Sequence, residues 1–338
     1  MKALLLTTHG GAESFSMTEQ PTPEPGPGEV RIDVRASGVN FADIMARMGL
    51  YPDCPPLPCV LGYEVSGVIE AVGAGVDASW IGKRVMAGTR FGGYASRAVT
   101  ALGNCIVIPD AWSFEQGASV LVAFGTAYVG ICRLGNVEPG ELVVIHAAAG
   151  GVGAAATQLA KYRGARVIGT SSASKHEFLR SNGVDVCVDY TREDISQVIA
   201  RHSNGKGADM IFDARGGKAF QQDYDALAAG GRLVMYGAGD AVSGEKRNLI
   251  TALKTILAMP KFKAMHLTKN NRSVAGINVL ALWDAWGELS KLANPLAALV
   301  EEGVIRPVVH GSFQAAQVGD AHSCILQRKN IGKVVLSW

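Results

Sequence analysis

A glycine-rich stretch near the middle of the chain, residues 141–161, limits the possible folds more than any other feature. It opens with the large aliphatic run Leu142–Ile145, which predicts a buried strand. It closes with apolar residues at the spacing of a helix that lies on a sheet: Val152, Ala155, Ala156, Leu159 and Ala160. The glycines between them predict a tight turn whose backbone N–H groups, at a helix N-terminus, can bind a pyrophosphate. An ordinary tight turn is the alternative.

The composition is typical of a well-packed globular protein. The 338 residues are enough for about two domains, 48% of them are hydrophobic and only 18% are charged. The net charge is +2, and the Lys and Arg residues are scattered along the chain. This pattern argues against nucleic acid as a partner.

Targeting and cysteine signals favour a cytoplasmic protein. The first apolar run is too short for a secretory signal peptide, and we expect no apolar segment of the roughly 18 residues that span a bilayer. Six irregularly spaced cysteines indicate reduced thiols. Cys54 and Cys59 lie close in sequence, but no second Cys or His pair stands at ligand spacing, so we expect no metal there.

Two patterns of secondary structure divide the chain. Up to about residue 122, short runs separated by glycines predict the strands of a β-barrel-like domain: 30–35, 64–72, 82–86 and 93–99. Beyond it, strands alternate with helices and predict a parallel, doubly wound sheet: 142–145, 166–170, 185–190, 209–213, 231–237 and 273–278. Ser174 and Glu177 have the spacing of a capping box that would open the second helix.

The end of the chain is expected to return to the first domain. Residues 332–336 predict a closing strand, so the first domain comprises 1–122 and 285–338, with the α/β domain, 123–284, inserted between them. Residues 248–267 are apolar with interspersed lysines and one proline. They could cover a substrate site, form a subunit interface or contact an anionic membrane, and membrane contact is the least expected of the three.

The end of the second α/β strand indicates which nucleotide the domain binds. Sites for NAD place a carboxylate there to bind the ribose 2′-OH, but residues 169–172 are Gly-Thr-Ser-Ser, and Lys175 follows. Hydroxyls beside a cation suit a 2′-phosphate, which a carboxylate would repel. The sequence therefore favours NADPH, with a solvated Lys175 at a helix start as the alternative reading of that residue.

Several strings together resemble the medium-chain dehydrogenase/reductase superfamily, in its zinc-free quinone oxidoreductase, or zeta-crystallin-like, branch. The nucleotide motif extends from Gly140 to Lys161, and further segments resemble vesicle amine transport protein homologues: residues 38–47, 49–51, 172–177 and 246–249. The resemblance covers essentially the whole chain. It implies an α/β protein with a GroES-like β-barrel catalytic domain and a Rossmann nucleotide-binding domain.

The resemblance also implies that no metal takes part. Zinc enzymes of the superfamily bind their catalytic ion with a Cys and with the His of a Gly-His-Glu segment, whereas the matching residues here are Asn40 and Tyr63. Neither residue replaces a thiolate or an imidazole in a tetrahedral zinc site. The four-cysteine structural lobe is missing too, since only Cys105 falls in that region.

The site residues follow from the resemblance. Asn40, Tyr51 and Tyr63 are the catalytic candidates, with Asn40 as a neutral amide donor and Tyr51 as either a proton donor or a wall of the pocket. Asp43 is expected to hold Tyr63 in place as a structural remnant. The cofactor candidates are Asn40, Ala147, Gly150, Gly151, Val152, Gly153, Thr170, Ser171, Lys175, Tyr190, Gly237, Asn278 and Arg328. Tyr190 could instead be a surface residue, Arg328 a helix cap, and His146 is expected to be a packed core histidine.

The predicted function is hydride transfer from NADPH to a quinone or an α,β-unsaturated carbonyl compound, without a metal. An enoyl reductase of a lipid or polyketide pathway is the alternative within enzymes. A nucleotide-binding, membrane- or lipid-associated protein without enzymatic activity is the alternative from another class. By resemblance, we also expect a homodimer.

Overall fold

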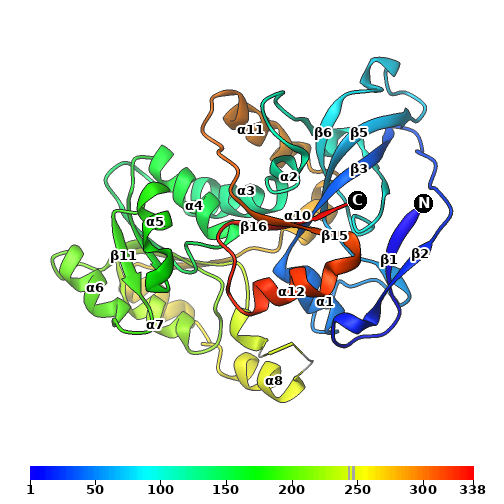
Figure 1. Ribbon diagram of the computed structural model, residues 1–338. Coiled ribbons are helices and arrows are strands. Elements are labelled where there is room, and N and C mark those ends of the chain that lie inside the picture. Colours follow the sequence, from blue (N-terminus) through cyan, green and yellow to red (C-terminus); the bar gives the residue numbers. More distant parts are fainter. Residues whose placement is uncertain (243, 246–247) are drawn as a thin grey trace. The chain divides into compact units, whose positions relative to one another are not determined.

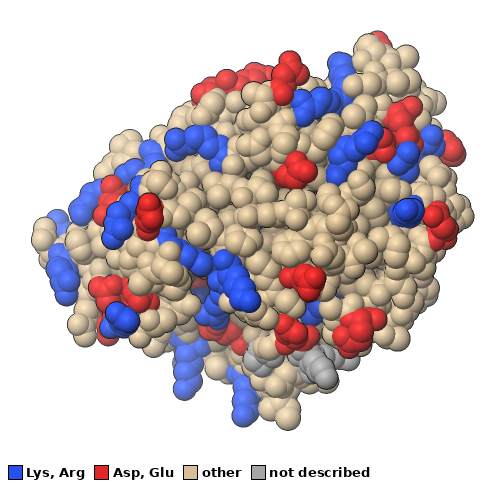
Figure 2. All heavy atoms as spheres, viewed as in Figure 1, with Lys and Arg blue, Asp and Glu red and all other residues tan. Residues whose placement is uncertain are grey.

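The computed structural model describes residues 1–242, 244–245 and 248–338, so Lys246 and Arg247 of one matched segment lie outside the described residues. The chain forms two compact units. Unit 1 contains Met1–Gly125, Gly244, Glu245 and Val279–Trp338. Unit 2 contains residues 126–242 and Asn248–Asn278. On the face drawn in Figure 2, Lys and Arg side chains are interspersed with Asp and Glu, as the small net charge leads one to expect.

Unit 2, whose strand β11 is labelled in Figure 1, is built on a six-stranded sheet in the order β11-β10-β9-β12-β13-β14, and every pairing is parallel. The strands are β9 (Leu142–Ile145), β10 (Arg166–Ser171), β11 (Val186–Asp189), β12 (Ala208–Asp213), β13 (Leu227–Met235) and β14 (Ser273–Gly276). The strand order reverses between β9 and β12. Open sheets of this kind bind ligands outside the carboxyl ends of the strands at that reversal. The predicted doubly wound sheet is confirmed.

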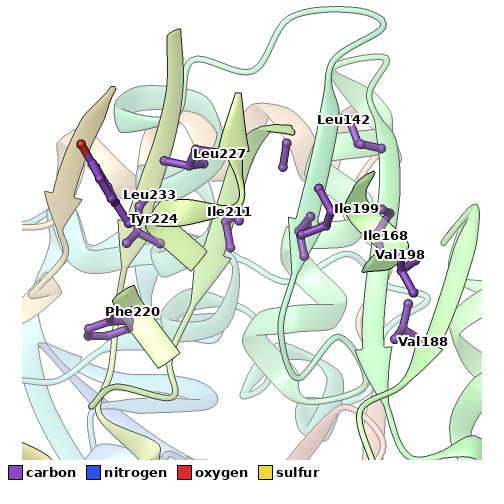
Figure 3. Close-up of a cluster of buried hydrophobic side chains, with 12 residues drawn as sticks. Leu142, Ile168, Val188, Val198, Ile199, Ile211, Phe220, Tyr224, Leu227 and Leu233 are labelled. Atoms are coloured by element: carbon purple, nitrogen blue, oxygen red, sulfur yellow. The ribbon is translucent and has the colours of Figure 1, made fainter. Parts of the chain in front are cut away.

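Helices cover both faces of this sheet. They are a π-helix at Tyr128–Leu134, α4 (Gly151–Tyr162), α5 (His176–Ser181), α6 (Ile195–His202), α7 (Ala219–Asp225), α8 (Leu249–Leu257) and α9 (Ala264–Asn270). On one face, Ile211 and Leu233 pack with Val198 of α6 and Phe220 of α7 (Figure 3). The next residue, Phe212, points to the other face and packs against the π-helix, where a Cβ on Gly130 would lie 2.4 Å from its ring.

Unit 1 is mostly antiparallel. Its larger sheet has the order β15-β16-β3-β5-β6-β8, with β7 also pairing with β3, and its smaller sheet has the order β2-β1-β4. The strands are β1 (Lys2–Leu6), β2 (Phe15–Glu19), β3 (Glu29–Val39), β4 (Cys59–Val60), β5 (Glu64–Val72), β6 (Arg84–Gly88), β7 (Arg97–Ala101), β8 (Cys105–Val107), β15 (Val309–Gln314) and β16 (Lys333–Ser337). Strand β16 pairs with β3, which confirms that the closing strand returns to the first part of the chain.

The helices of unit 1 include α1 (Phe41–Arg47), α2 (Phe114–Gly117), α10 (Val279–Trp286), α11 (Ser290–Glu301) and α12 (Val318–Leu326), and α3 (Leu121–Ala127) continues into unit 2. The apolar core of its sheet lies between β3, β5 and β6, with Val30, Ile32, Val65, Ile69 and Val85 fully buried. Strands β6 and β7 begin two and four residues later than predicted, because glycines before them form turns.

Two local predictions are wrong. Ser174 does not cap α5, since residues Ala173–Lys175 first form a 3-10 turn and α5 begins at His176 with no side-chain cap. The hydroxyl of Ser174 instead lies 3.2 Å from that of Ser172. The absence of a long apolar segment was also wrongly predicted, since the helix Phe114–Leu134 has 21 residues and a mean hydropathy of 1.5. However, 72% of its most apolar window is buried, as is typical of a core helix.

The unsettled segment 248–267 contains α8 and the start of α9. Five large apolar side chains of α8 are exposed: Leu249, Ile250, Leu253, Ile256 and Leu257. Pro260 lies between the two helices, as the break in the sequence pattern predicted. This exposed apolar face is what each of the three roles predicted for the segment would use.

Candidate active site

The glycine loop of unit 2 joins β9 to α4. Gly150 is the N-cap residue of α4 and makes no side-chain cap bond, so the first N–H groups of this 12-residue helix are not capped by a side chain. Ala147 adopts a left-handed φ of 51°, and the Gly150 N–H donates to its carbonyl oxygen at 2.9 Å. A Cβ on Gly153 would lie 2.3 Å from that carbonyl oxygen, so only glycine allows this approach. The loop therefore fits a pyrophosphate group.

The carboxyl end of β10 carries hydroxyls and no carboxylate. Thr170 is buried, and its Oγ1 accepts from the Ala147 N–H at 3.3 Å, so this side chain supports the glycine loop. The Ser171 hydroxyl donates to the Ser172 carbonyl at 3.0 Å. Lys175 is half-buried at the start of α5, and Tyr190, directly after β11, is 45% exposed. The end of β10 itself therefore lacks the carboxylate that would repel a 2′-phosphate, while Asp189 of the neighbouring β11, which pairs with Ser171, has its carboxylate bonded to Thr191.

Other predicted cofactor residues follow strands of the same parallel sheet. Gly237 comes shortly after β13 and is exposed, and a Cβ there would lie 3.2 Å from Ala214. Asn278 follows β14 and is exposed. Because all carboxyl ends of a parallel sheet meet at one edge, the structure brings these residues to the same edge as the glycine loop. Arg328 belongs instead to unit 1, after α12, with a φ of 53°.

A buried charged cluster at this edge was missed by the sequence reasoning. His146, expected to be a packed core residue, is indeed buried, but its Nε2 lies 3.1 Å from Asp223 Oδ1. Asp213 completes a set of three ligand atoms within 4.8 Å of one another, which could hold a metal ion. The guanidinium of Arg215, however, bonds to both carboxylates and supplies the positive charge there. The sequence signal for this cluster was Asp213, an acidic residue at the end of a buried strand, which needs a charged or hydrogen-bonding partner.

In unit 1, Asn40 is the N-cap residue that joins β3 directly to α1, and Asp43 lies in the first turn of α1. The Asp43 carboxylate accepts from the Asn40 N–H at 2.9 Å and from the Gly62 N–H at 3.0 Å. Burial raises the pKa of Asp43 to about 7, although these hydrogen bonds and Lys333 oppose the shift. Asp43 does not hold Tyr63 through the Tyr63 hydroxyl, which has no partner among the described residues, but its carboxylate binds the N–H of Gly62, the residue directly before Tyr63.

The Asn40 side chain is engaged on both sides. Its Nδ2 donates to Glu64 Oε1 at 3.2 Å, and its Oδ1 accepts from Lys333 Nζ at 2.5 Å. Lys333 also pairs with Glu64, whose Oε2 accepts from the Val122 N–H at 2.9 Å. All three side chains are buried. Sequence reasoning missed Glu64 and Lys333, although a lysine in an otherwise apolar closing strand was a signal for a buried partner.

Three aromatic rings gather beside these residues. The rings of Tyr51 and Tyr63 meet edge to face at 6.2 Å, and Phe91 lies 5.0 Å from Tyr63. The hydroxyls of the two tyrosines interact electrostatically but lack hydrogen-bond geometry. Burial, followed by the charge of Asp53, raises the pKa of Tyr51 to about 12, and burial together with Asp43 raises that of Tyr63. Both hydroxyls are therefore protonated donors at neutral pH.

The residues at Asn40 and Tyr63 do not fit a tetrahedral zinc ion. A zinc site needs thiolate, imidazole or carboxylate donors. Here Asn40 offers an amide oxygen that already accepts from an ammonium group, and Tyr63 keeps its proton. A second cation beside Lys333 would be repelled. These residues therefore do not form a catalytic zinc site.

Comparisons with known protein families agree with the folds of both units. Residues 26–110 match the family described as alcohol dehydrogenase GroES-like domain, and residues 151–294 match that described as zinc-binding dehydrogenase. With the α/β architecture, these matches define an oxidoreductase of the medium-chain dehydrogenase/reductase class.

Similar proteins indicate the family within this class to which the chain belongs. The synaptic vesicle membrane protein VAT-1 homolog of Rattus norvegicus is 39% identical to this chain. The match covers 99% of this chain and 84% of the length of the rat protein. A mycobacterial protein complexed with NADPH is 31% identical, with a TM-score of 0.86 over all of both chains. Escherichia coli quinone oxidoreductase, also complexed with NADPH, is 28% identical, with a TM-score of 0.85 over both whole chains. The chain belongs to the zinc-free, quinone oxidoreductase-like family that includes the VAT-1 homologues.

Replacing Lys333 by Met is expected to lower the free energy of unfolding by about 3–5 kcal/mol, because Glu64 would remain buried without its counter-charge. Replacing Glu64 by Gln in the same chain should restore more than half of the loss, since no charge is then left unpaired. Urea unfolding of the two single variants and the double variant measures this. Additive losses in the double variant would contradict the pairing.

Proposed function

We propose that the protein transfers hydride from NADPH to a quinone or an α,β-unsaturated carbonyl compound and uses no metal. The observation that carries the proposal is the uncapped N-terminus of α4, which lies beside a strand end that has hydroxyls and a lysine but no carboxylate. Two structural neighbours, the mycobacterial protein and Escherichia coli quinone oxidoreductase, are both complexed with NADPH and support this choice of cofactor.

Unit 2 supplies the groups that would hold the cofactor. The N–H groups at the start of α4 would bind the pyrophosphate, and the positive end of the helix dipole favours its negative charge. Ser171, Lys175 and Tyr190 would bind the adenosine half with its 2′-phosphate, and the loop at Gly237 would face the nicotinamide half. When bound, the cofactor supplies the hydride, which is the chemistry the protein side chains cannot perform.

Unit 1 supplies hydrogen-bond donors and an aromatic surface. Tyr63 is our candidate for the donor to the substrate carbonyl oxygen, since its hydroxyl is protonated and has no partner among the residues the structure describes. A donor at that oxygen stabilises the negative charge that develops as hydride arrives. The rings of Tyr51 and Phe91 would pack against a planar conjugated acceptor. Asn40, held by Glu64 and Lys333, would shape this surface through its position.

An enoyl reductase is the second candidate, and one comparison favours it. CurK enoyl reductase is 27% identical, with a TM-score of 0.86 over 99% of both chains. Both reactions add hydride to a conjugated carbonyl compound, so they differ in the group attached to the carbonyl carbon, a thioester in the enoyl substrate, rather than in the donors described above.

Purified protein is mixed with NADPH and 9,10-phenanthrenequinone, and the absorbance of the reduced cofactor is followed. Oxidation of NADPH that exceeds oxidation of NADH supports the proposal. A crotonyl thioester used as sole acceptor at a higher kcat/KM than any quinone or free enone would favour the enoyl reductase. Tight NADPH binding without turnover on any of these acceptors would favour a non-enzymatic nucleotide-binding protein.

Tyr63→Phe is expected to lower kcat by about 100-fold with little change in KM for NADPH, because it removes a donor needed mainly in the transition state. Tyr51→Phe is the matched control, since it removes the neighbouring hydroxyl and keeps the ring; it should cost less than about tenfold. Steady-state kinetics with a quinone measures both. A larger loss in Tyr51→Phe than in Tyr63→Phe would assign the donor to Tyr51 and contradict this part of the proposal.

Lys175→Met is expected to raise KM for NADPH by about tenfold and to leave KM for NADH unchanged, because only NADPH carries the 2′-phosphate that the ammonium would bind. Lys206→Met is the matched control, since Lys206 is exposed and precedes β12 at the opposite end of the strands. Equal changes in KM for the two coenzymes would remove Lys175 from the 2′-phosphate site.

A further inference from the structure

Arg215 lies at the centre of a buried ionic network in unit 2. Its Nε donates to Asp213 Oδ1 at 3.0 Å, and its terminal nitrogen donates to both oxygens of Asp223 at 2.8 Å. His146 Nε2 lies 3.0 Å from the same nitrogen. The side chains of Asp213 and Asp223 are 0% and 1% exposed, whereas the Arg215 side chain is 30% exposed. One cation therefore holds together the end of β9, the end of β12 and α7.

The network is costly to bury unless Arg215 is present. Burial raises the pKa of Asp213 to about 6, and one of its oxygens has no hydrogen-bond partner among the described residues. Burial alone would also raise the pKa of Asp223, but His146 and Arg215 hold it well below its usual range. Without the guanidinium, two buried carboxylates would lie close together and repel each other.

This network holds the loop after β12 in place, and that loop in turn holds the loop after β13. The Arg215 N–H donates to Asp213 Oδ1 at 2.8 Å, which sets the turn after β12. The loop after β13 then pairs with this turn through backbone bonds, from Tyr236 to Asp213 at 3.0 Å, from Gly239 to Ala214 at 2.7 Å and from Asp240 to Arg215 at 2.8 Å.

The two loops lie at the edge of the sheet where strand order reverses, beside the glycine loop that starts at His146. Another partly buried ion pair of unit 2 joins Arg232 of β13 to Glu141, which directly precedes β9. That pair lies toward the amino ends of the strands, away from the loops. Arg215 thus supports the loops after β12 and β13, whereas the Arg232 pair does not.

We propose that Arg215 is a positioning residue that holds the loops after β12 and β13 in the conformation that receives the nicotinamide half of NADPH. The inference rests on the proposed function, because it needs a cofactor on this edge of the sheet. Arg215 acts through the backbone of these loops. Misplacing a reacting ring by about 1 Å can cost about 100-fold in rate while distant binding contacts persist.

The test compares Arg215→Met with Arg232→Met as the matched control. For each variant, calorimetry gives the Kd for 2′,5′-ADP, which reports the adenosine half alone, and fluorescence of the bound reduced nicotinamide reports the other half. Arg215→Met is expected to leave the Kd for 2′,5′-ADP within twofold of wild type, to lose most of the fluorescence enhancement and to lower kcat by about 100-fold. Arg232→Met should keep the enhancement and kcat within about threefold.

Asp223→Asn keeps the shape of the network and guards against a variant that does not fold. Like Arg215→Met, it should keep the Kd for 2′,5′-ADP and lower both the fluorescence enhancement and kcat, but by a smaller factor. Arg215→Lys should recover part of the fluorescence and kcat that Arg215→Met loses. The inference would be overturned if Arg215→Met kept the fluorescence enhancement and kcat of wild type. It would also be overturned if Arg232→Met lost them while keeping the Kd for 2′,5′-ADP. If wild-type protein neither binds 2′,5′-ADP nor oxidises NADPH, the proposed function itself fails, which is a distinguishable result.

Discussion

The close approach of α4 to the end of β9 is the contact that makes a cofactor site at this edge of the sheet possible. Gly153 makes it possible, because any Cβ there would overlap the Ala147 carbonyl. The approach leaves the first N–H groups of α4 without a side-chain cap and aims a helix dipole at the edge where the strand order reverses. Unsatisfied donors at a helix start need a partner, and an anionic group is the partner they favour.

Buried charge organises both units. In unit 1, Lys333 joins Glu64 and Asn40, and in unit 2, Arg215 joins Asp213 and Asp223. Each cation satisfies acids that burial alone would make expensive to ionise. The side chain left without a partner among the described residues of this part of unit 1 is Tyr63, a protonated donor. A site of this kind stabilises charge with fixed dipoles and cations of the protein itself, which is consistent with chemistry that needs no metal.

The sequence predicted the α/β sheet well because buried parallel strands are continuous aliphatic runs. Leu142–Ile145 was predicted to the residue, and all six strands exist. Strands β6 and β7 were misplaced by a few residues, since glycine turns blur short antiparallel strands. The absence of a carboxylate after β10 could be read directly, because it depends on residues close in sequence. The cytoplasmic location and the homodimer stay predictions.

The charged networks could not be predicted, because their partners are far apart in the chain. Lys333 and Asn40 are separated by 293 positions, and Arg215 and His146 by 69. Asp43 was assigned to Tyr63 from the resemblance, whereas the structure gives its oxygens to the N–H groups of Asn40 and Gly62. Such assignments need the backbone positions, which spacing along a sequence does not supply.

Calorimetric titration of the protein with NADPH and, separately, with NADH tests the central claim most directly. We expect one site for NADPH with a Kd of about 1–100 μM and binding of NADH at least about tenfold weaker. Equal affinity for the two coenzymes, or no heat of binding with either, would contradict it.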